Sequence, residues 1–241
     1  MIDSAATLRS IALAKPATIR VFERFGLDYC CGGSRPLALA CAEKNLDTEA
    51  FLSALADAAA SAPEERDFTK ATATELISHI VGTHHAFIRG ELPRLEAIAA
   101  KVAQKHGQSH PEVLEIQQML QVLGEDLLQH LYKEEAILFP YVQSLERSLK
   151  GNADLPHACF GSVESPVRVM IQEHENAAEL LEQMRATSGG FAPPPDACPT
   201  FAGFYDGLGA FERDLHRHVH LENNLLFPLA IEMEQGAQLS R

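Results

Sequence analysis

One short pattern occurs twice in this chain and constrains its fold more than any other feature. Each copy has a histidine, a glutamate four residues later, and then a Leu-Phe-Pro triplet. The copies begin at His130 and His218, so their glutamates are Glu134 and Glu222. Residues four apart share one face of a helix, so each copy directs an imidazole and a carboxylate the same way. A pair of such helices predicts a metal site.

The residues around both copies place these polar side chains on the buried face of a helix. Steps of three and four residues along the sequence meet apolar side chains, and only the histidine and the glutamate interrupt them. The apolar positions are Val113, Ile116, Leu120, Leu123, Leu127, Ile137 and Tyr141 for the first copy, and Phe201, Phe204, Leu208, Phe211, Leu215, Leu225 and Leu229 for the second. Both copies are therefore expected to point into a core.

Two further helical stripes each carry one histidine. His85 interrupts the apolar stripe from Val81 to Val102, and His174 interrupts the stripe from Val163 to Met184. Four such helices predict a four-helix bundle. His84 lies on a neighbouring stripe that becomes charged, which is typical of the flank of a helix. We therefore interpret His85, rather than His84, as the inward residue.

A metal explains these polar interruptions better than six unrelated core residues do. Taken singly, a histidine on an apolar face is usually a hydrogen-bonded core residue. A single glutamate there often indicates that the apolar stripe of the helix has been assigned in the wrong register. Two carboxylates buried without a counter-charge, however, would each cost on the order of several kcal/mol. A bound cation removes that cost, so the pattern favours a metal site.

The ligand set predicts two ions rather than one. Four imidazoles and two carboxylates are too many for one tetrahedral zinc. They suit two ions bridged by both carboxylates, with two histidines on each ion and space for a bridging oxygen and an exchangeable ligand. Ligand type alone leaves iron, manganese and zinc open.

A second motif lies near the start of the chain, where residues 27–33 read Leu-Asp-Tyr-Cys-Cys-Gly-Gly. The His-x3-Glu repeat resembles hemerythrin-like domains, which are four-helix bundles that hold a non-haem di-iron centre. The cysteine motif ahead of such a bundle, with Glu-His-Glu at 173–175 and Leu-Glu-Asn-Asn at 221–224, resembles the repair of iron centres (RIC) family. The resemblance covers nearly the whole chain and favours iron. It implies an all-α protein with a small helical Cys-Cys domain over residues 1–60, similar to the ScdA amino-terminal domain, and a hemerythrin-like di-iron four-helix bundle over residues 70–241.

The resemblance also implies the ligands of the two iron ions, which an oxo or hydroxo bridge would join. They fall on the residues that the stripes selected: His85, His130, Glu134, His174, His218 and Glu222. The implied function is the repair of iron-sulfur clusters damaged by oxidative or nitrosative stress, through donation of iron or through binding or reduction of nitric oxide. Its partners would be damaged iron-sulfur proteins, with nitric oxide or dioxygen as small ligands. Whether the protein is an enzyme stays open.

Two other functions remain as alternatives. One is a sensor or reservoir that binds nitric oxide or dioxygen without turnover, and the other is a bundle with a purely structural metal. Only four histidines lie on the stripes, whereas an oxygen-carrying hemerythrin uses five, so reversible carriage of oxygen is disfavoured. The resemblance leaves the oligomeric state open, and a homodimer is allowed.

Cys30 and Cys31 are candidates for a catalytic redox role. They lie in a glycine-rich turn ahead of a helix expected near Ser34 to Pro36. The N-terminus of that helix would favour the thiolate form. The alternative is that both cysteines simply pack in a tight turn.

Two acidic residues lie beside the expected ligands. Asp126 is one turn before His130, and Glu173 is next to His174. Each is a candidate for a role beside the metal or on its access path, and the alternative is a charge on a solvated helix face.

Composition excludes several other classes of function. The 241 residues carry a formal net charge of −13, which repels nucleic acid and anionic membrane surfaces. The chain begins without a recognisable signal segment and has no apolar run of membrane-spanning length, which indicates a cytoplasmic protein with no membrane segment. Its five cysteines do not form the pattern of a disulfide framework.

The pattern also predicts where helices end. A linker is expected from Ala58 to Thr69 and a loop from Gly151 to Pro166. Pro140 and Pro228 are expected to kink or end their helices just beyond the metal ligands.

Overall fold

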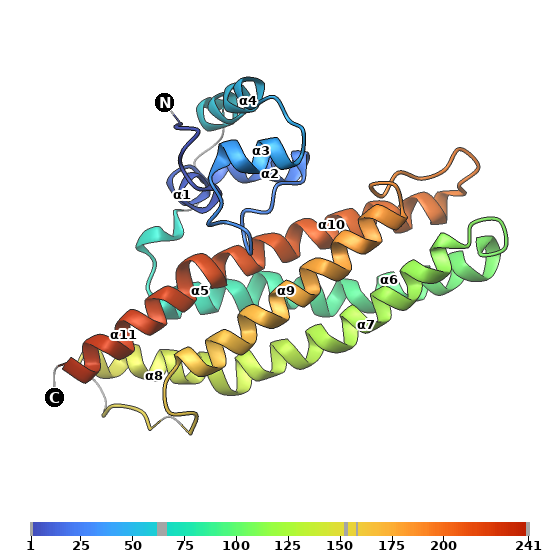
Figure 1. Ribbon diagram of the computed structural model, residues 1–241. Helices are drawn as coiled ribbons and strands as arrows, with labels where there is room; N and C mark the ends of the chain where they lie inside the picture. Colours follow the sequence, from blue (N-terminus) through green and yellow to red (C-terminus); the bar gives the residue numbers. More distant parts are fainter. Residues whose placement is uncertain (1, 62–66, 152–153, 158, 240–241) are drawn as a thin grey trace.

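The computed structural model describes residues 2–61, 67–151, 154–157 and 159–239, and over these residues the protein is all-α. Within them, β-type pairing is limited to one isolated antiparallel bridge between Thr7 and Pro36. The fold class expected from the sequence, a four-helix bundle preceded by a small helical domain, is confirmed (Figure 1).

The small domain forms the first part of the chain. The Thr7 hydroxyl accepts the N–H of Ser10 at the start of the first helix, and Gly26 ends the second with a left-handed φ of 64°. Its helices pack around a core that includes Phe22, Tyr29 and Phe51. They are α1 (Leu8–Ala14), α2 (Ile19–Phe25), α3 (Leu37–Glu43) and α4 (Thr48–Ser61), with a 3-10 turn at Pro16–Thr18 before α2.

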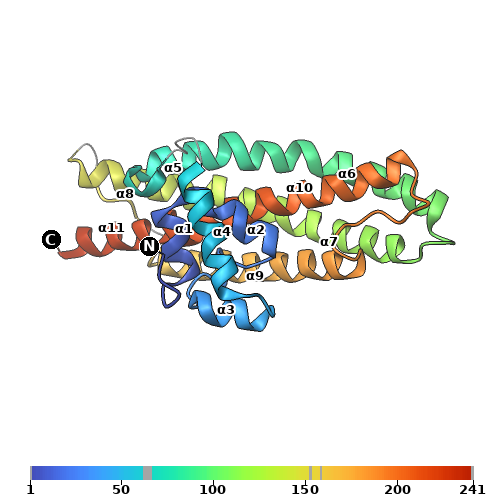
Figure 2. The same ribbon diagram turned by 90° about the horizontal axis from the view of Figure 1, so that it is seen from above.

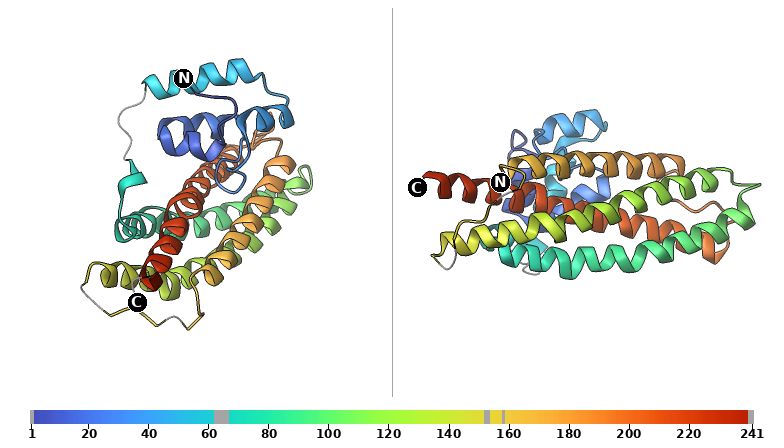
Figure 3. Two further views of the ribbon diagram at one scale, coloured as in Figure 1. Left: turned by 60° about the vertical axis from the view of Figure 1, so that its left-hand side comes forward. Right: turned by 90° about the horizontal axis from the view of Figure 1, so that it is seen from below.

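Four long helical stretches form the bundle (Figures 1 and 3). The third stretch is a single helix, whereas each of the others consists of two α-helices joined by a short π-helical segment. In chain order the stretches are α5 (Ala73–His79) with α6 (Ala86–His106), α7 (Glu112–Lys133) with α8 (Phe139–Leu149), α9 (Glu164–Thr187), and α10 (Pro199–Leu221) with α11 (Phe227–Leu239). The π segments are Ile80–His85, Glu134–Leu138 and Glu222–Leu226.

The two prolines that follow the repeated motif do not end their helices. Pro140 and Pro228 lie in the first turns of α8 and α11, each directly after a π segment. A proline ring clashes with the carbonyl four residues earlier in a regular α-helix, and it has no N–H to donate. The wider π turn accommodates both the proline ring and the missing N–H. In it, the residue before each proline donates its N–H to the carbonyl of the motif glutamate, five residues earlier. Pro140 and Pro228 were expected to kink or end their helices; the helical stretches continue through both prolines, and the irregularity is the π turn just before each of them.

Two expected segment boundaries also differ from the structure. Helix α4 continues to Ser61, so the expected linker begins later than Ala58, and its residues 62–66 lie outside the described ranges. Helix α9 begins at Glu164, so Pro166 lies in its first turn, where a missing N–H costs nothing.

The small domain lies on α10 and beside α9 (Figures 1 and 2). The guanidinium of Arg217 donates to both carboxylate oxygens of Glu23 at 2.8 and 2.9 Å, and the side chain of Glu23 is almost fully buried. The amide of Asn224 donates to the carbonyl of Tyr29 at 3.3 Å. These contacts fix the Cys-Cys loop, which follows Tyr29, against the bundle.

None of the described helices combines the length and the apolar character that crossing a membrane requires.

Candidate metal centre

The six residues selected from the sequence come together inside the bundle. Each is at least 97 % buried, although all six are polar or charged: His85 (0 % exposed), His130 (2 %), Glu134 (0 %), His174 (3 %), His218 (0 %) and Glu222 (0 %). The first, second, third and fourth helical stretches all contribute at least one of them. The flanking apolar stripes form the core around them, which explains their burial.

The four imidazoles form two pairs whose Nε2 atoms converge. The Nε2 atoms of His85 and His218 are 3.2 Å apart, and those of His130 and His174 are 3.0 Å apart. Each pair joins histidines from two different helical stretches. Two nitrogens at this distance, both turned toward the same small space, form half of a site for one cation.

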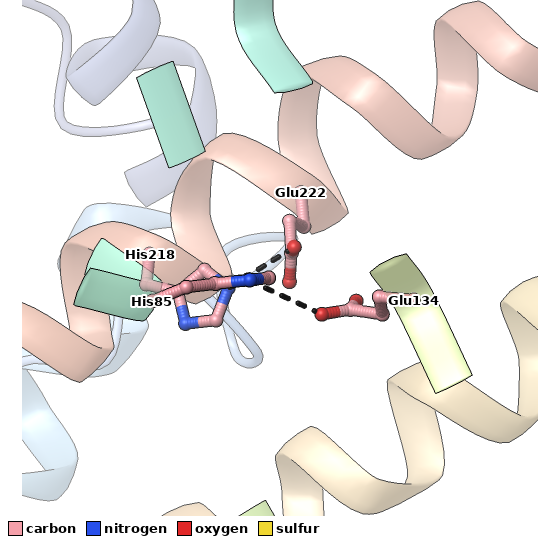
Figure 4. Close-up of side chains that lie close together, drawn as sticks. All are labelled: His85, Glu134, His218 and Glu222. Atoms are coloured by element: carbon pink, nitrogen blue, oxygen red, sulfur yellow. Dashed lines mark hydrogen bonds and ion pairs between the residues drawn. The ribbon is translucent and has the colours of Figure 1, made fainter. Parts of the chain in front are cut away.

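Each glutamate spans both histidine pairs. In Glu134, Oε2 lies 3.4 Å from Nε2 of His85, and Oε1 lies 3.3 Å from Nε2 of His130. In Glu222, Oε1 lies 3.0 Å from Nε2 of His218, and Oε2 lies 3.1 Å from Nε2 of His174. Figure 4 shows one half of this arrangement, with His85 and His218 facing both carboxylates. Each pair of nitrogens therefore has one oxygen from each glutamate.

The donor atoms fit a pair of cations. All four carboxylate oxygens of Glu134 and Glu222 are buried and have no hydrogen-bond partner within the described part of the chain. Buried carboxylates in that state are costly unless a cation compensates them. The donors form two groups, each with two nitrogens and two oxygens, and both groups share the two glutamates. Within each group all donor atoms lie within 4.8 Å of one another. The groups are His85, Glu134, His218 and Glu222, and His130, Glu134, His174 and Glu222.

Both glutamates are held in the ionised form that a metal ligand requires. Burial raises the pKa of Glu222, but the neighbouring His218 and His174 outweigh burial and hold the pKa well below its usual value. Burial and the charge of Glu222 raise the pKa of Glu134, and His130 and His85 reverse that effect, so its pKa is also lowered. The site therefore presents two negative charges to the imidazole nitrogens.

Three of the four imidazoles are oriented by a hydrogen bond at the outer nitrogen, Nδ1. His85 bonds to Glu135 at 2.6 Å, His130 to Glu173 at 2.8 Å, and His174 to Asn223 at 2.9 Å. A donor bond from Nδ1–H leaves the lone pair of Nε2 free to face a metal. Glu173 was predicted from the sequence as a residue beside the metal, whereas Glu135 and Asn223 were not. Their signal was present, since each directly follows a motif glutamate.

The site has an approximate internal repeat that explains the position of His84. Glu173 precedes His174 and holds His130, and in the matching place His84 precedes His85 and faces His218. Instead of a hydrogen bond, His84 offers its ring face, which lies parallel to the ring of His218 at 5.8 Å. His84 is 5 % exposed and bonds to Asp214 at 3.0 Å, so the expectation of a helix-flank residue was wrong. His85 is the residue that reaches the centre.

The π segments lie at the ligands. One ends at His85, and the other two begin at Glu134 and Glu222. A π turn adds a residue to a helical turn and so changes which side chains face the interior. It lets each motif glutamate point inward while the following residue reaches a histidine on another helical stretch.

A pocket of about 190 Å³ leads from the surface between α7 and α9 to one histidine pair. His130 and His174 lie at its inner end, and Asp126 and Glu173 line it. The ammonium of Lys133, also in the lining, forms an ion pair with Glu173. Hydrogen bonds from His130 and Lys133 lower the pKa of Glu173 to about 2. This pocket is large enough for a small ligand, and both acidic candidates beside the expected ligands belong to it.

The cysteine pair lies outside the bundle centre but close to it. Cys30 is buried and Cys31 is half-buried, and the Sγ of Cys31 is 4.0 Å from the amide nitrogen of Asn223. The expected thiolate is not favoured at Cys30: the hydrogen bond with Cys31, burial and the charge of Asp28 all raise its pKa. Helix α3 begins only at Leu37, and the loop N–H groups are bonded to Asp28 instead of facing a thiolate.

Comparison with known proteins agrees with this geometry. The family model described as hemerythrin HHE cation binding domain matches residues 76–230, and that of ScdA_N, a domain of unknown function (DUF542), matches residues 4–59. The chain is 37 % identical over 228 residues to the iron-sulfur cluster repair protein YtfE of Citrobacter koseri, which covers 94 % of this chain and 97 % of that protein. The YtfE proteins of Escherichia coli O157:H7 and Shigella boydii match with the same identity and coverage.

The two family matches together span both parts of the fold, and the cation-binding match contains all six converging side chains. The chain therefore belongs to the repair of iron centres family, in which an ScdA_N domain precedes a hemerythrin HHE cation-binding bundle.

Proposed function

We propose that this protein holds a non-haem di-iron centre and serves the repair of iron-sulfur clusters damaged by oxidative or nitrosative stress. The observation that carries the proposal is the pair of carboxylates that each span two histidine pairs, with all four oxygens buried and without a hydrogen bond among the described residues. The similarity to proteins named for iron-sulfur cluster repair supports the choice of iron and of the repair function.

The residues divide the work in the proposed centre. His85 and His218 would hold one iron, His130 and His174 the other, and Glu134 and Glu222 would bridge them, with an oxo or hydroxo bridge completing the pair. When bound, the iron ions supply positions where small ligands can exchange. Glu135, Glu173 and Asn223 fix the imidazole rings.

The metal content tests the first part of the proposal. Protein purified from iron-replete cells should contain two irons per chain, and Glu134→Ala and Glu222→Ala should each lower that content. The iron content is measured by elemental analysis before and after anaerobic reconstitution. Substantially less than two metals per chain, not recovered by reconstitution, would contradict a di-iron centre.

Iron donation tests the second part. Loaded protein, incubated without oxygen with an apo-ferredoxin, a sulfide source and a chelator that holds free iron, should produce cluster absorbance faster than free iron does under the same chelation. The natural partners would be damaged iron-sulfur proteins, and the proposed place of action is the cytoplasm. If the loaded protein gives no advantage over free iron, the donation route loses its support.

The pocket between α7 and α9 favours a second candidate function, the binding of nitric oxide or dioxygen without turnover. The pocket has the size of a small ligand and ends at His130 and His174. Titration of the reduced protein with each gas separates the candidates. Stable stoichiometric adducts would support a sensor or reservoir, whereas nitrous oxide formed over many cycles would identify an enzyme that reduces nitric oxide. A homodimer, if it forms, would be seen in the molar mass during the same preparations.

A further inference from the structure

A second group of metal-ligating side chains lies in the small domain, apart from the bundle centre. One carboxylate oxygen of Asp28 and the sulfur atoms of Cys30 and Cys31 lie within 4.8 Å of one another. The Sγ of Cys30 is 3.2 Å from Oδ1 of Asp28. Two adjacent sulfurs and an oxygen offer three donors to one ion.

The loop that carries these donors is held in place before any ligand arrives. Oδ1 of Asp28 accepts the N–H groups of Cys30 and Cys31 at 3.0 and 2.9 Å, and Oδ2 accepts that of Gly32 at 2.7 Å. A side chain at Gly33 would place its Cβ 2.5 Å from the carbonyl oxygen of Tyr29, so the tight turn requires glycine there. The same carbonyl accepts the amide of Asn224, which ties the loop to the bundle.

A cleft gives the group access to solvent. Its volume is about 490 Å³, and it lies between the small domain and the surface of α9 and α10. Asp28 and Cys31 are in its lining, which contains seven acidic residues and three basic ones. Each of the basic residues, Arg35, Lys44 and Arg185, forms an ion pair with a glutamate of the same lining. The cleft is therefore a negatively charged approach that attracts cations.

The group is connected to the bundle centre through one side chain. The amide nitrogen of Asn223 is 4.0 Å from the Sγ of Cys31, and its Oδ1 is 2.9 Å from Nδ1 of His174. One residue thus separates the thiols from a histidine of the proposed di-iron centre. The ligand chemistry on its two sides differs, because the bundle offers nitrogen and oxygen whereas the loop offers mainly sulfur.

We propose that Asp28, Cys30 and Cys31 form a separate binding site for one thiophilic divalent cation, which in the function proposed above is ferrous iron. Only the choice of iron rests on that function. Binding replaces the two thiol protons by the cation, and the protons leave through the cleft, so no electron transfer is required. Burial and neighbouring groups raise the pKa of Cys30 in the metal-free loop, so the loop favours a protonated thiol until a cation binds.

Cobalt(II) is the probe for this site, because its bonds to thiolate give an intense near-ultraviolet charge-transfer band that nitrogen and oxygen ligands do not give. The full-length protein is first loaded at the bundle centre and then titrated without oxygen. Cys159→Ser and Cys198→Ser are present in the background, so that these more accessible thiols do not contribute. We expect the band to saturate at one equivalent of cobalt per chain, and ferrous iron to displace it.

Variants of the loop show whether the band comes from this group. Cys31→Ser, a change at a half-buried position, should abolish the band and weaken binding by at least about tenfold. Cys30→Ala should do the same, with circular dichroism used to check that the domain is folded. Cys41→Ser is the matched control, because Cys41 is a buried thiol of the same small domain outside the group, and it should leave the band unchanged. A titration without the band, or a band that survives both loop variants in folded protein, would overturn the proposal.

The two metal proposals can fail independently. Glu134→Ala with Glu222→Ala removes the ligands shared by both histidine pairs and leaves the loop intact. The thiolate band should persist in this double variant if the loop binds its own cation. Loss of the band there would show that no separate site exists, whereas an unchanged band together with a metal-free bundle in the parent protein would contradict only the di-iron centre.

Discussion

At the scale of single residues, the ring orientation of the four histidines of the proposed metal centre depends on groups outside the proposed ligand set. Three imidazoles are fixed by a hydrogen bond, to Glu135, Glu173 or Asn223, and the fourth is fixed by the stacked ring of His84. Such outer partners commonly determine metal affinity as strongly as small changes in the ligands themselves. They are therefore the most informative positions to change without removing a ligand.

Glu173→Gln should weaken metal binding by about tenfold, because the neutral amide is a poorer acceptor for the N–H of His130 and no longer pairs with Lys133. Competition with a calibrated chelator measures the affinity. Glu125→Gln, on an exposed position of α7, is the matched control and should have no effect. Equal affinity in the Glu173 variant and the parent would show that this hydrogen bond does not position His130.

Replacement of His84 tests the stacked ring. His84→Phe keeps an aromatic face against His218 and should retain most of the metal affinity, whereas His84→Ala should lose about tenfold. The spectrum of the loaded protein should also change in the alanine variant, because the freed ring of His218 can rotate. The same loss in both variants would favour the hydrogen bond to Asp214, rather than the stacking, as the contribution of His84.

At the scale of helices, the π segments connect the sequence to the geometry of the centre. Pro140 and Pro228 each lack the N–H that a continuous α-helix would use, and the register changes just before each of them. The prolines therefore keep the wide turn where the motif glutamates begin it. The irregular turns lie at the proposed ligands, and π turns are frequent at functional sites.

Pro140→Ala should separate stability from metal binding. Alanine suits a regular helix, so the free energy of unfolding of the metal-free protein should stay equal or rise, while metal affinity falls because Glu134 is no longer held in its register. Urea unfolding and chelator competition measure the two quantities. Pro93→Ala, within α6 and away from the π segments, should leave metal affinity unchanged. Unchanged affinity in the Pro140 variant would mean that the π turn forms without the proline.

Glu146, in α8, gives a prediction about how the stability of the protein depends on pH. Its carboxylate accepts the N–H of Thr74 at 3.0 Å at the start of α5 and pairs with Lys150 at 2.8 Å. Burial raises its pKa, but these bonds outweigh burial and lower the pKa below its usual value of 4.5. A lowered pKa in the folded state stabilises the protein above pH 4.5, and this contribution is lost as the pH falls through the folded-state pKa.

Glu146→Gln should therefore lower the free energy of unfolding at pH 7 by about 1.5–3 kcal/mol, the usual range for a hydrogen bond to a charged group. The difference from the parent protein should shrink as the pH is lowered below 4.5. Urea unfolding of the metal-free proteins at several pH values measures it. A difference that stays constant with pH would show that the charge of Glu146 does not contribute.

Much of this arrangement could be predicted from the sequence, for reasons that differ between residues. The long apolar stripes predicted the bundle and the inward side chains of His130 and His218, because helical periodicity is a local property. His84 could not be assigned, since its burial depends on Asp214 and His218 from another helix. The raised pKa of Cys30 also escaped prediction, because the loop N–H groups are taken by Asp28.

At the scale of the whole molecule, the metal centre and the stability of the bundle are linked. The four helical stretches meet at two buried carboxylates, which the neighbouring histidines hold in the ionised form in the metal-free protein. Bound metal favours the folded state by about 4 kcal/mol when its free concentration is 1,000 times the dissociation constant. The protein should therefore be far more stable when loaded.

Removal of the metal should lower the melting temperature of the parent protein markedly, and Glu222→Gln should lower the melting temperature of the metal-free protein further. The glutamine variant loses a buried charge that His218 and His174 stabilise, so its metal-free form should melt below the metal-free parent, and added metal should stabilise it much less. Calorimetry with and without a chelator compares the four samples. A metal-free variant that melts at or above the metal-free parent would show that the histidines do not compensate the buried charge of Glu222.

Both histidine pairs share both carboxylates, and this affects how the proposed centre would release its metal ions. A rotation of Glu134 or Glu222 that withdraws one oxygen from the first pair also displaces the other oxygen from the second. In the proposed di-iron centre, departure of one ion would leave the other with a displaced carboxylate, so the second departure would be faster than the first. The proposed centre would then release its two ions nearly together rather than one at a time.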